Sequence, residues 1–167
     1  NYKDAIEIER DYALAYWGLG NIYEARFVKD DDKKDFDLMF DYYSKAYEID
    51  QDLAEANIGL GWAHFFQEDL DNAYRFYKRA FELGPNNAEI YFNIAGFLRD
   101  IGLYNKAIEF YSKAIELDPT STLYLHLCAR CYMSIGEFEK AAKLLKEALE
   151  LDPNDVKLRL FYARQFI

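Results

Sequence analysis

Two cysteines and a histidine lie close together in the sequence HLCARC, at His126, Cys128 and Cys131. Cysteines at this spacing can hold a metal ion or exchange a disulfide. A zinc site needs a second pair of ligands, which the sequence lacks. A redox-active pair gains its low thiol pKa at a helix N-terminus, whereas this pair is predicted in the middle of a helix. We favour the alternative, two small buried residues on a helix, and predict neither a metal nor a cofactor.

Other groups that could support catalysis are few. The two histidines, His64 and His126, are the only candidate histidine bases, and the cysteines near His126 are interpreted above as buried packing residues. A glycine-rich phosphate loop and an HExxH sequence are both missing. The abundant Asp and Glu residues fit solvated helix faces better than paired catalytic acids. We therefore predict a protein that is not an enzyme, with no catalytic residues.

The composition is that of a folded, acidic protein. The 167 residues are 51% hydrophobic and 18% aromatic, and the net charge is −10. Because binding of phosphates needs clustered Lys and Arg, this charge argues against a nucleic-acid partner. No stretch approaches 18 uncharged apolar residues, so we predict no membrane insertion. Unpaired thiols fit a reducing compartment, and we expect a cytoplasmic protein.

A period of 34 residues runs through the chain. Residues of one type recur at this interval in three sets: Ala73, Ala107 and Ala141; Ala80, Ala114 and Ala148; Pro85, Pro119 and Pro153. A fixed period of this length predicts a helical solenoid, in which each unit buries its apolar face against its neighbours. Apolar residues at the fourth, seventh, eighth and eleventh places fit one face of a first helix. The proline follows a second helix, which it cannot continue.

These residues resemble the tetratricopeptide repeat, whose pattern W-x2-L-G-x2-Y…A-x3-F-x2-A…P they follow in three consecutive units. The resemblance implies an all-α fold, a right-handed α-solenoid (superhelix) of antiparallel helix pairs that forms a single domain. In this frame we predict the end of a preceding helix B in 1–12, four repeats in 13–53, 54–87, 88–121 and 122–155, and helix A of a further repeat in 156–167.

The first repeat is seven residues longer than the others, and the excess lies in RFVKDDDKKDFDLMF, between its two helices. Seven residues make about two helical turns. We expect about one extra turn on each helix, with Asp30, Asp31 and Asp32 at the tip. Met39 replaces the usual alanine, which predicts looser or shifted packing there. The long hairpin is then either a solvated extension or a protruding contact for a partner.

In the tetratricopeptide family, helix A of each repeat lines a concave groove. The resemblance therefore implies that a partner protein or peptide binds there. Several apolar residues of this chain occupy places where packing alone asks for none, and exposed apolar strips of this kind mark binding surfaces. Gly96 would leave a gap for a partner side chain. The predicted groove residues are Trp17, Asn21, Ile58, Trp62, Phe65, Phe92, Gly96, Arg99, His126, Arg130, Met133, Leu160 and Arg164.

Two parts of this prediction have alternatives. Asn57 and His64 occupy packing places in the second repeat, so that helix could be rotated and bury Trp62 instead. Three arginines form a basic lane that either pairs with acidic residues of adjacent repeats or holds partner carboxylates; they are Arg99, Arg130 and Arg164. The family's carboxylate clamp for chaperone tails is not matched, because only Asn21 falls at a clamp place.

We expect a scaffold or adaptor that binds a partner peptide or helix in this groove. Two other functions stay open: a repeat module that recruits substrate to a larger enzyme, and a self-assembling scaffold. Self-association is predicted through the last helix, where Phe161 and Phe166 add to more apolar surface than one neighbouring repeat covers. The chain does not begin with Met, and Asn1 already falls inside a repeat, so we expect a piece of a longer protein.

Overall fold

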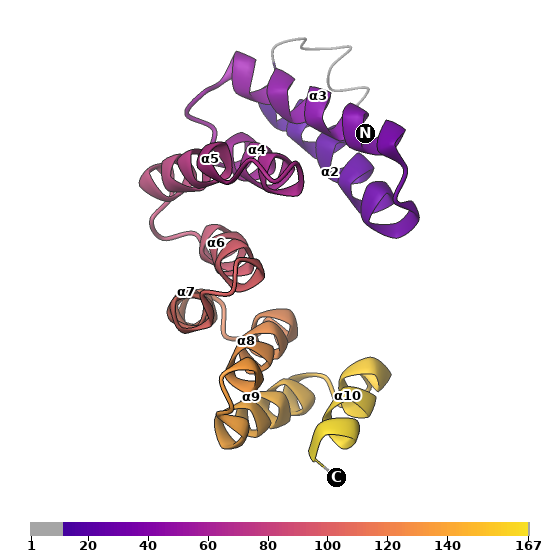
Figure 1. The fold of residues 1–167 in the computed structure, drawn as a ribbon, viewed down its shortest axis with the longest axis vertical. Helices are drawn as coiled ribbons and strands as arrows, with labels where there is room; N and C mark the ends of the chain where they lie inside the picture. The colour runs from indigo at the N-terminus through magenta and orange to yellow at the C-terminus, as the bar shows by residue number, and fades with distance from the viewer. Residues whose placement is uncertain (1–11, 167) are drawn as a thin grey trace. The chain divides into compact units, whose positions relative to one another are not determined.

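The computed structural model describes residues 12–166, and every regular element within that range is a helix. In chain order the helices are α2 (Ala13–Asp30), α3 (Lys33–Ile49), α4 (Ala54–Phe66), α5 (Leu70–Leu83), α6 (Ala88–Asp100), α7 (Tyr104–Leu117), α8 (Thr122–Ser134), α9 (Phe138–Leu151) and α10 (Val156–Phe166). Figure 1 shows that consecutive helices pair into hairpins. The predicted all-α class is confirmed. Of the segment 1–12, predicted to end a preceding helix, residues 1–11 lie outside the described range.

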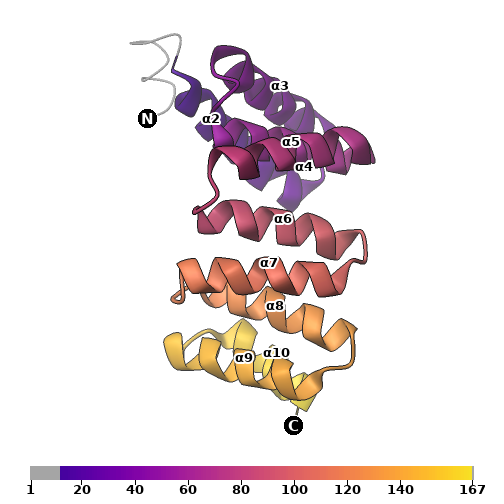
Figure 2. The same cartoon turned by 90° about the vertical axis from the view of Figure 1, so that its left-hand side faces the viewer.

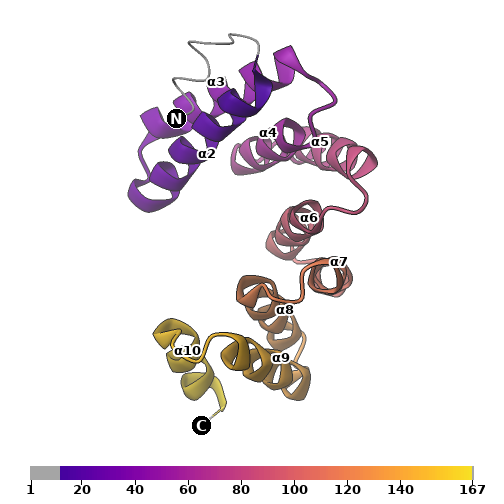
Figure 3. The ribbon, with the colours of Figure 1, turned by 180° about the vertical axis from the view of Figure 1, so that it is seen from behind.

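The chain forms two compact units, Asn1–Pro85 (unit 1) and Asn86–Ile167 (unit 2). Unit 1 contains α2 to α5, and its α4 packs against α5, α3 and α2. Unit 2 contains α6 to α10; α8 packs against α9 and α7, and α10 packs against α9. Figures 2 and 3 show the hairpins of each unit from two further directions.

Short polar side chains begin several of these helices. Asp32 accepts a hydrogen bond from the backbone N–H of Lys34 at 2.9 Å, and Asn87 accepts one from Glu89 at 2.9 Å. Asp69 and Ser121 bond in the same way to the first turns of α5 and α8. Such side chains satisfy backbone N–H groups that have no partner inside the helix. The caps therefore set where these helices start.

The turns between paired helices differ in the residue that takes the left-handed backbone conformation. In unit 2 it is a glycine, Gly102 (φ 81°) after α6 and Gly136 (φ 80°) after α8. In unit 1 it is Asp31 (φ 52°) after α2 and Glu68 (φ 61°) after α4. Residues with a side chain pay a steric cost in this conformation that glycine avoids. The turns of unit 1 are therefore the more strained.

The seven extra residues of the first hairpin lie in its helices. The helices α2 and α3 have 18 and 17 residues, against 13 and 14 in α4 and α5. Asp31 and Asp32 alone connect α2 to α3. Arg26 pairs with the buried Asp35 at 3.0 Å across the lengthened part. Met39, at the place where other repeats have alanine, is fully buried.

A tyrosine on the second helix of three hairpins fills the space beside the first helix. Tyr43, Tyr77 and Tyr111 are all buried. The ring of Tyr43 lies so close to Gly20 of α2 and Gly59 of α4 that a Cβ at either glycine would overlap it. The ring of Tyr111 leaves more room, because a Cβ on Gly96 would meet only its hydroxyl, at 3.9 Å. The core of unit 1 is thus the more tightly closed around its tyrosine.

Candidate binding site

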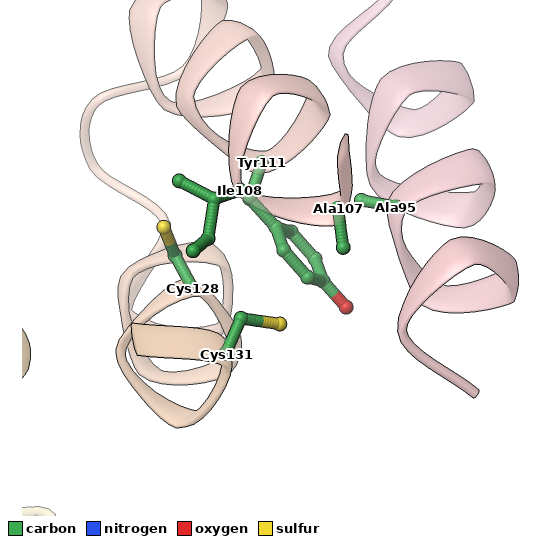
Figure 4. Packing of buried hydrophobic residues seen from close by; sticks show 6 residues of the cluster. All are labelled: Ala95, Ala107, Ile108, Tyr111, Cys128 and Cys131. Atoms are coloured by element: carbon green, nitrogen blue, oxygen red, sulfur yellow. The ribbon is translucent and has the colours of Figure 1, made fainter. Parts of the chain in front are cut away.

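The two cysteines lie in the core of unit 2, in the middle of α8. Both are free thiols, and both are buried against Tyr111 and Ile108 of α7. Figure 4 shows these side chains together, with the two sulfur atoms pointing in different directions. Burial raises the pKa of Cys128 to about 12 and that of Cys131 to about 11, so both remain protonated near neutral pH. Among residues 12–166, no cluster of His, Cys, Asp and Glu could hold a metal ion.

A hollow of about 480 Å³ lies in unit 2. Four helices or their ends contribute to it, and three of its lining residues belong to the predicted groove: Arg99, Arg130 and Met133. The full lining is Arg99, Asp100, Tyr104, Arg130, Met133, Ser134 and Phe161. Two cationic side chains, one carboxylate, two aromatic side chains and a thioether thus line one space.

Arg99 is held in a fixed position at this hollow. Its Nε donates to Oδ1 of Asp100 at 2.7 Å, and its Nη1 donates to the hydroxyl of Tyr111 at 3.3 Å. The side chain is 24% exposed. The hydrogen bond to Asp100 raises the pKa of Arg99, and burial raises that of Tyr111, so the guanidinium stays charged and the hydroxyl protonated. This arginine therefore pairs with an acidic residue of its own helix and, among the described residues, not with one of an adjacent repeat.

Arg130 differs from Arg99 in its partners. It is exposed, and within residues 12–166 no carboxylate lies at ion-pair distance from it. Its positive charge contributes, after burial, to lowering the pKa of His126 one turn earlier on α8. Arg164, the third arginine of the predicted lane, is exposed on α10 and does not line the hollow. The lane is therefore a pair of arginines at one hollow plus a separate third.

His126 packs α8 against α10. Its ring centroid lies 4.9 Å from that of Phe161, and its Nε2 is buried with no hydrogen-bond partner among the described residues. Burial, followed by the charge of Arg130, lowers the pKa of His126. The ring is therefore uncharged near neutral pH and serves as a packing surface.

Two other predicted groove residues of unit 2 lie on α6. Phe92 is half-buried; its ring stacks on that of Tyr124 at 4.8 Å and contacts that of Tyr111 at 5.9 Å. Much of its surface is therefore used within the unit. Gly96 is partly exposed and has free space around the position of a Cβ.

In unit 1, Trp62 belongs to an aromatic cluster. It is half-buried, and its ring stacks on Phe66 at 5.2 Å and meets the edge of Phe27 at 6.2 Å. Asn57 and His64 do occupy packing places. Asn57 is fully buried and donates to the carbonyls of Gln51 and Leu53, while His64 stacks on Phe76 at 5.3 Å. Trp62 is thus partly enclosed by its own unit.

Ile58 is a correction to the predicted groove. It is buried, with 8% of its surface exposed. The cause is the position of α4, which packs against α5, α3 and α2 and so leaves little of its surface open. Ile58 therefore offers no surface to a partner. Trp17 and Phe65 are half-buried, and Asn21 accepts a hydrogen bond from the Tyr43 hydroxyl at 2.8 Å.

A second hollow, of about 250 Å³, lies where the long hairpin of unit 1 meets the end of α4. Three of its six lining residues are aromatic: it is lined by Phe27, Asp31, Lys33, Phe36, Phe66 and Gln67. Sequence reasoning missed this hollow. The available signal was the pair Phe27 and Phe36 on either side of the DDD tip, which a hairpin brings together; their ring centroids lie 5.2 Å apart.

The last helix, α10, is partly covered. Leu158 is buried, and Phe161 and Phe166 pack against a cluster that includes Leu125, Ala141 and Leu145. Leu160 remains 65% exposed and Val156 62% exposed. The two phenylalanines predicted for self-association are therefore used partly inside unit 2, and the open apolar surface lies at Leu160 and Val156.

Comparison with known proteins gives the class of this fold. Models of the tetratricopeptide repeat match residues 54–87 and 86–154. The chain belongs to the tetratricopeptide repeat family, whose members are helical solenoids that present extended binding surfaces and generally act as interaction scaffolds rather than catalysts. Comparison with curated proteins gave no match.

Solved structures agree with this assignment. YrrB, described as a TPR protein with an unusual peptide-binding site, aligns over 98% of this chain and 80% of its own, with TM-score 0.68 and 25% identity. MamA aligns over 93% of this chain and 81% of its own, with TM-score 0.64 and 25% identity. PilF of Pseudomonas aeruginosa, at TM-score 0.78, aligns over 91% of this chain and 66% of its own; at 22% identity it supports the fold alone.

One further structural finding concerns membranes. Within residues 12–166, no helix combines the length and the apolar character that crossing a bilayer requires.

Proposed function

We propose that this chain is an interaction scaffold that binds a segment of a partner protein, and that unit 2 carries the main contact. The observation behind this proposal is the hollow of about 480 Å³ formed by α6, α8, α10 and the start of α7. Arg99, Arg130 and Met133 come from the helices that the family pattern assigns to the binding face, and they share this one space.

The size and lining of the hollow support the proposal. Its volume lies within the range of ligand-binding pockets, about 300–1,000 Å³. Arginine and aromatic side chains supply much of the binding energy at protein interfaces, and Arg99, Arg130, Tyr104 and Phe161 provide them here. YrrB, a similar fold, is described as having a peptide-binding site, which favours a peptide over a small molecule.

Filling the hollow tests the proposal. Ser134 lines it and is exposed, so Ser134→Trp should occupy the space without disturbing the core. Lys143→Trp, on the exposed face of α9, is the matched control. A phage-displayed library of random peptides is first selected on the immobilised wild-type chain. Enriched peptides should bind the Lys143→Trp variant normally and the Ser134→Trp variant weakly. Equal binding to both variants would place the contact elsewhere.

Self-assembly is a second candidate function, favoured by the exposed Leu160 and Val156 on α10. Two apolar side chains on one short helix could meet the same helix of a second copy, which would give a closed dimer. Sedimentation at increasing concentration should then show association that Leu160→Glu abolishes. A monomer at all concentrations would remove this candidate.

A further inference from the structure

The hollow of unit 2 carries positive charge that its own carboxylate does not fully neutralise. Its charged lining residues are Arg99, Arg130 and Asp100. Asp100 pairs with Arg99. Arg130 has no carboxylate at ion-pair distance within residues 12–166. The guanidinium of Arg130 is therefore available to an acidic group of a ligand.

Arg99 also keeps hydrogen-bonding capacity toward the hollow. A guanidinium has five N–H donors, and the bonds to Asp100 and Tyr111 use Nε and one donor of Nη1. These two bonds hold the side chain in place, so ligand binding costs little conformational entropy at Arg99. Arg130 in turn is exposed on α8, where it can adjust to the ligand.

We propose that the hollow binds a carboxylate side chain, from an Asp or Glu within a partner segment, between the guanidinium groups of Arg99 and Arg130. The residues on either side of that acid contact the apolar lining side chains, Tyr104, Met133 and Phe161. This inference rests on the proposed function and adds the chemistry of the partner.

A carboxylate fits the site better than a polyanion does. A nucleic acid would bring many phosphates toward a protein with a net charge of −10, whereas one acidic residue meets only the local charge of the hollow. Guanidinium groups bind carboxylates with paired, charge-assisted hydrogen bonds. Because apolar side chains line the same hollow as the arginines, the partner residues before and after the acid can both contact them. This favours an internal residue over a chain terminus, which has a neighbour on one side only.

The two methionines of the chain allow a direct test. Met133 lines the hollow, and Met39 is fully buried in unit 1, so methyl-labelled methionine gives one NMR signal at the site and one reference. Three N-acetylated tripeptides serve as probes: acetyl-Leu-Glu-Leu-amide, its neutral Gln analogue, and the Gln analogue with a free carboxyl terminus. Each is titrated into the 167-residue chain.

The Glu peptide should shift the Met133 signal and leave that of Met39 in place, while the neutral peptide shifts neither at the same concentration. Arg130→Gln should lower the affinity for the Glu peptide about tenfold or more. Lys143→Gln, which removes one charge from the exposed face of α9, should change its affinity little. Added salt should weaken binding because it screens the charges.

Three other outcomes would contradict, in turn, the selection of a carboxylate, the internal position of the acid and the use of this hollow. If the Glu and Gln peptides shift Met133 equally, the hollow binds peptides but does not select a carboxylate, so this inference fails and the proposed function stands. If the peptide with the free terminus binds more tightly than the Glu peptide, the ligand is a chain end rather than an internal acid. If none of the peptides shifts Met133, both the inference and the use of this hollow are wrong.

Discussion

Unit 1 carries ten Lys and Arg against nineteen Asp and Glu, a net charge of −9, whereas unit 2 carries ten against eleven, a net charge of −1. The same family pattern thus builds an acidic pair of hairpins and a nearly neutral one. The difference extends to their hollows. That of unit 1 is lined by three phenylalanines with one Asp and one Lys, and that of unit 2 contains two arginines with one Asp. Charge and cavity chemistry therefore both favour unit 2 as the site that we propose for an acidic segment.

The units also differ in how their helices are held. In unit 1, Tyr43 is enclosed by Gly20 and Gly59, and its hydroxyl lies within hydrogen-bond distance of Asn21 and Glu24. In unit 2, the hydroxyl of Tyr111 instead accepts a bond from Arg99 at the hollow. The comparison shows one repeat position used in two ways: to close a core in unit 1, and to hold Arg99 at the hollow in unit 2.

The largest expected effect is the loss of the Tyr43 ring. Tyr43→Ala should lower the free energy of unfolding by about 3–5 kcal/mol, because it empties a fully buried site. Tyr74→Ala, at a tyrosine of α5 that is 62% exposed, is the control and should change it by about 0.5 kcal/mol or less. Chemical denaturation measures both. Similar losses for the two variants would show that Tyr43 is not central to unit 1.

Alanine at two glycines that lie beside buried tyrosines should have opposite effects in the two units. Gly59→Ala should cost about 1–3 kcal/mol, because the new Cβ overlaps the Tyr43 ring. Gly96→Ala should stabilise by up to about 1 kcal/mol, because alanine favours helix and the new Cβ meets an ordinary contact at 3.9 Å. Thermal melting of both variants compares them. A shift in the same direction for both would contradict the tighter packing assigned to unit 1.

The turns provide a smaller contrast. Glu68→Gly should stabilise unit 1 by about 0.5–1 kcal/mol, because glycine adopts a φ of 61° without a steric cost. Gly102→Ala should destabilise unit 2 by about 1–2 kcal/mol for the converse reason. Denaturation midpoints give both values. A neutral Glu68→Gly would mean that the strain at this turn is offset by contacts of the glutamate.

The smallest effect is a pH dependence that comes from His126 in unit 2. Burial, then Arg130, lowers the pKa of His126 below its ordinary value of 6.5, while Asp155 acts in the opposite direction. At pH values between the lowered pKa and 6.5, His126 binds a proton more readily in the unfolded chain than in the folded one. The contribution of His126 to the free energy of unfolding should therefore be complete above pH 6.5 and decline as the pH falls below it. His126→Gln should make the free energy of unfolding depend less steeply on pH in this range. An unchanged pH dependence in this variant would mean that other groups cause it.

Much of the architecture follows from the sequence. The spacing of Ala73, Ala107 and Ala141 and the matching prolines predicted an all-α repeat fold, because close helix packing and helix ends demand those residue types. The fold was therefore accessible without coordinates. The buried cysteines were accessible for the same reason, since their place within a helix excludes the usual redox geometry.

The binding face was harder to predict, because repeat position does not determine exposure. Ile58 was expected to be open, but contacts of α4 with three helices bury it. Trp62 stacks on Phe66 of its own helix, and it also meets Phe27, which the long hairpin brings toward α4. The hollow of unit 2 brings Arg99 and Asp100 of α6 together with Arg130 of α8 and Phe161 of α10. Contacts between helices decide these features, and no single repeat encodes them.

The central claim is that unit 2, rather than unit 1, holds the partner segment. Hydrogen–deuterium exchange with mass spectrometry tests it most directly, because peptides from each unit report separately. With a peptide selected on the wild-type chain, protection should increase in α6, α8 and α10, and Ser134→Trp should abolish that increase. Protection confined to α2, α3 and α4, and unchanged in the Ser134→Trp variant, would contradict the claim and move the site to the aromatic hollow of unit 1.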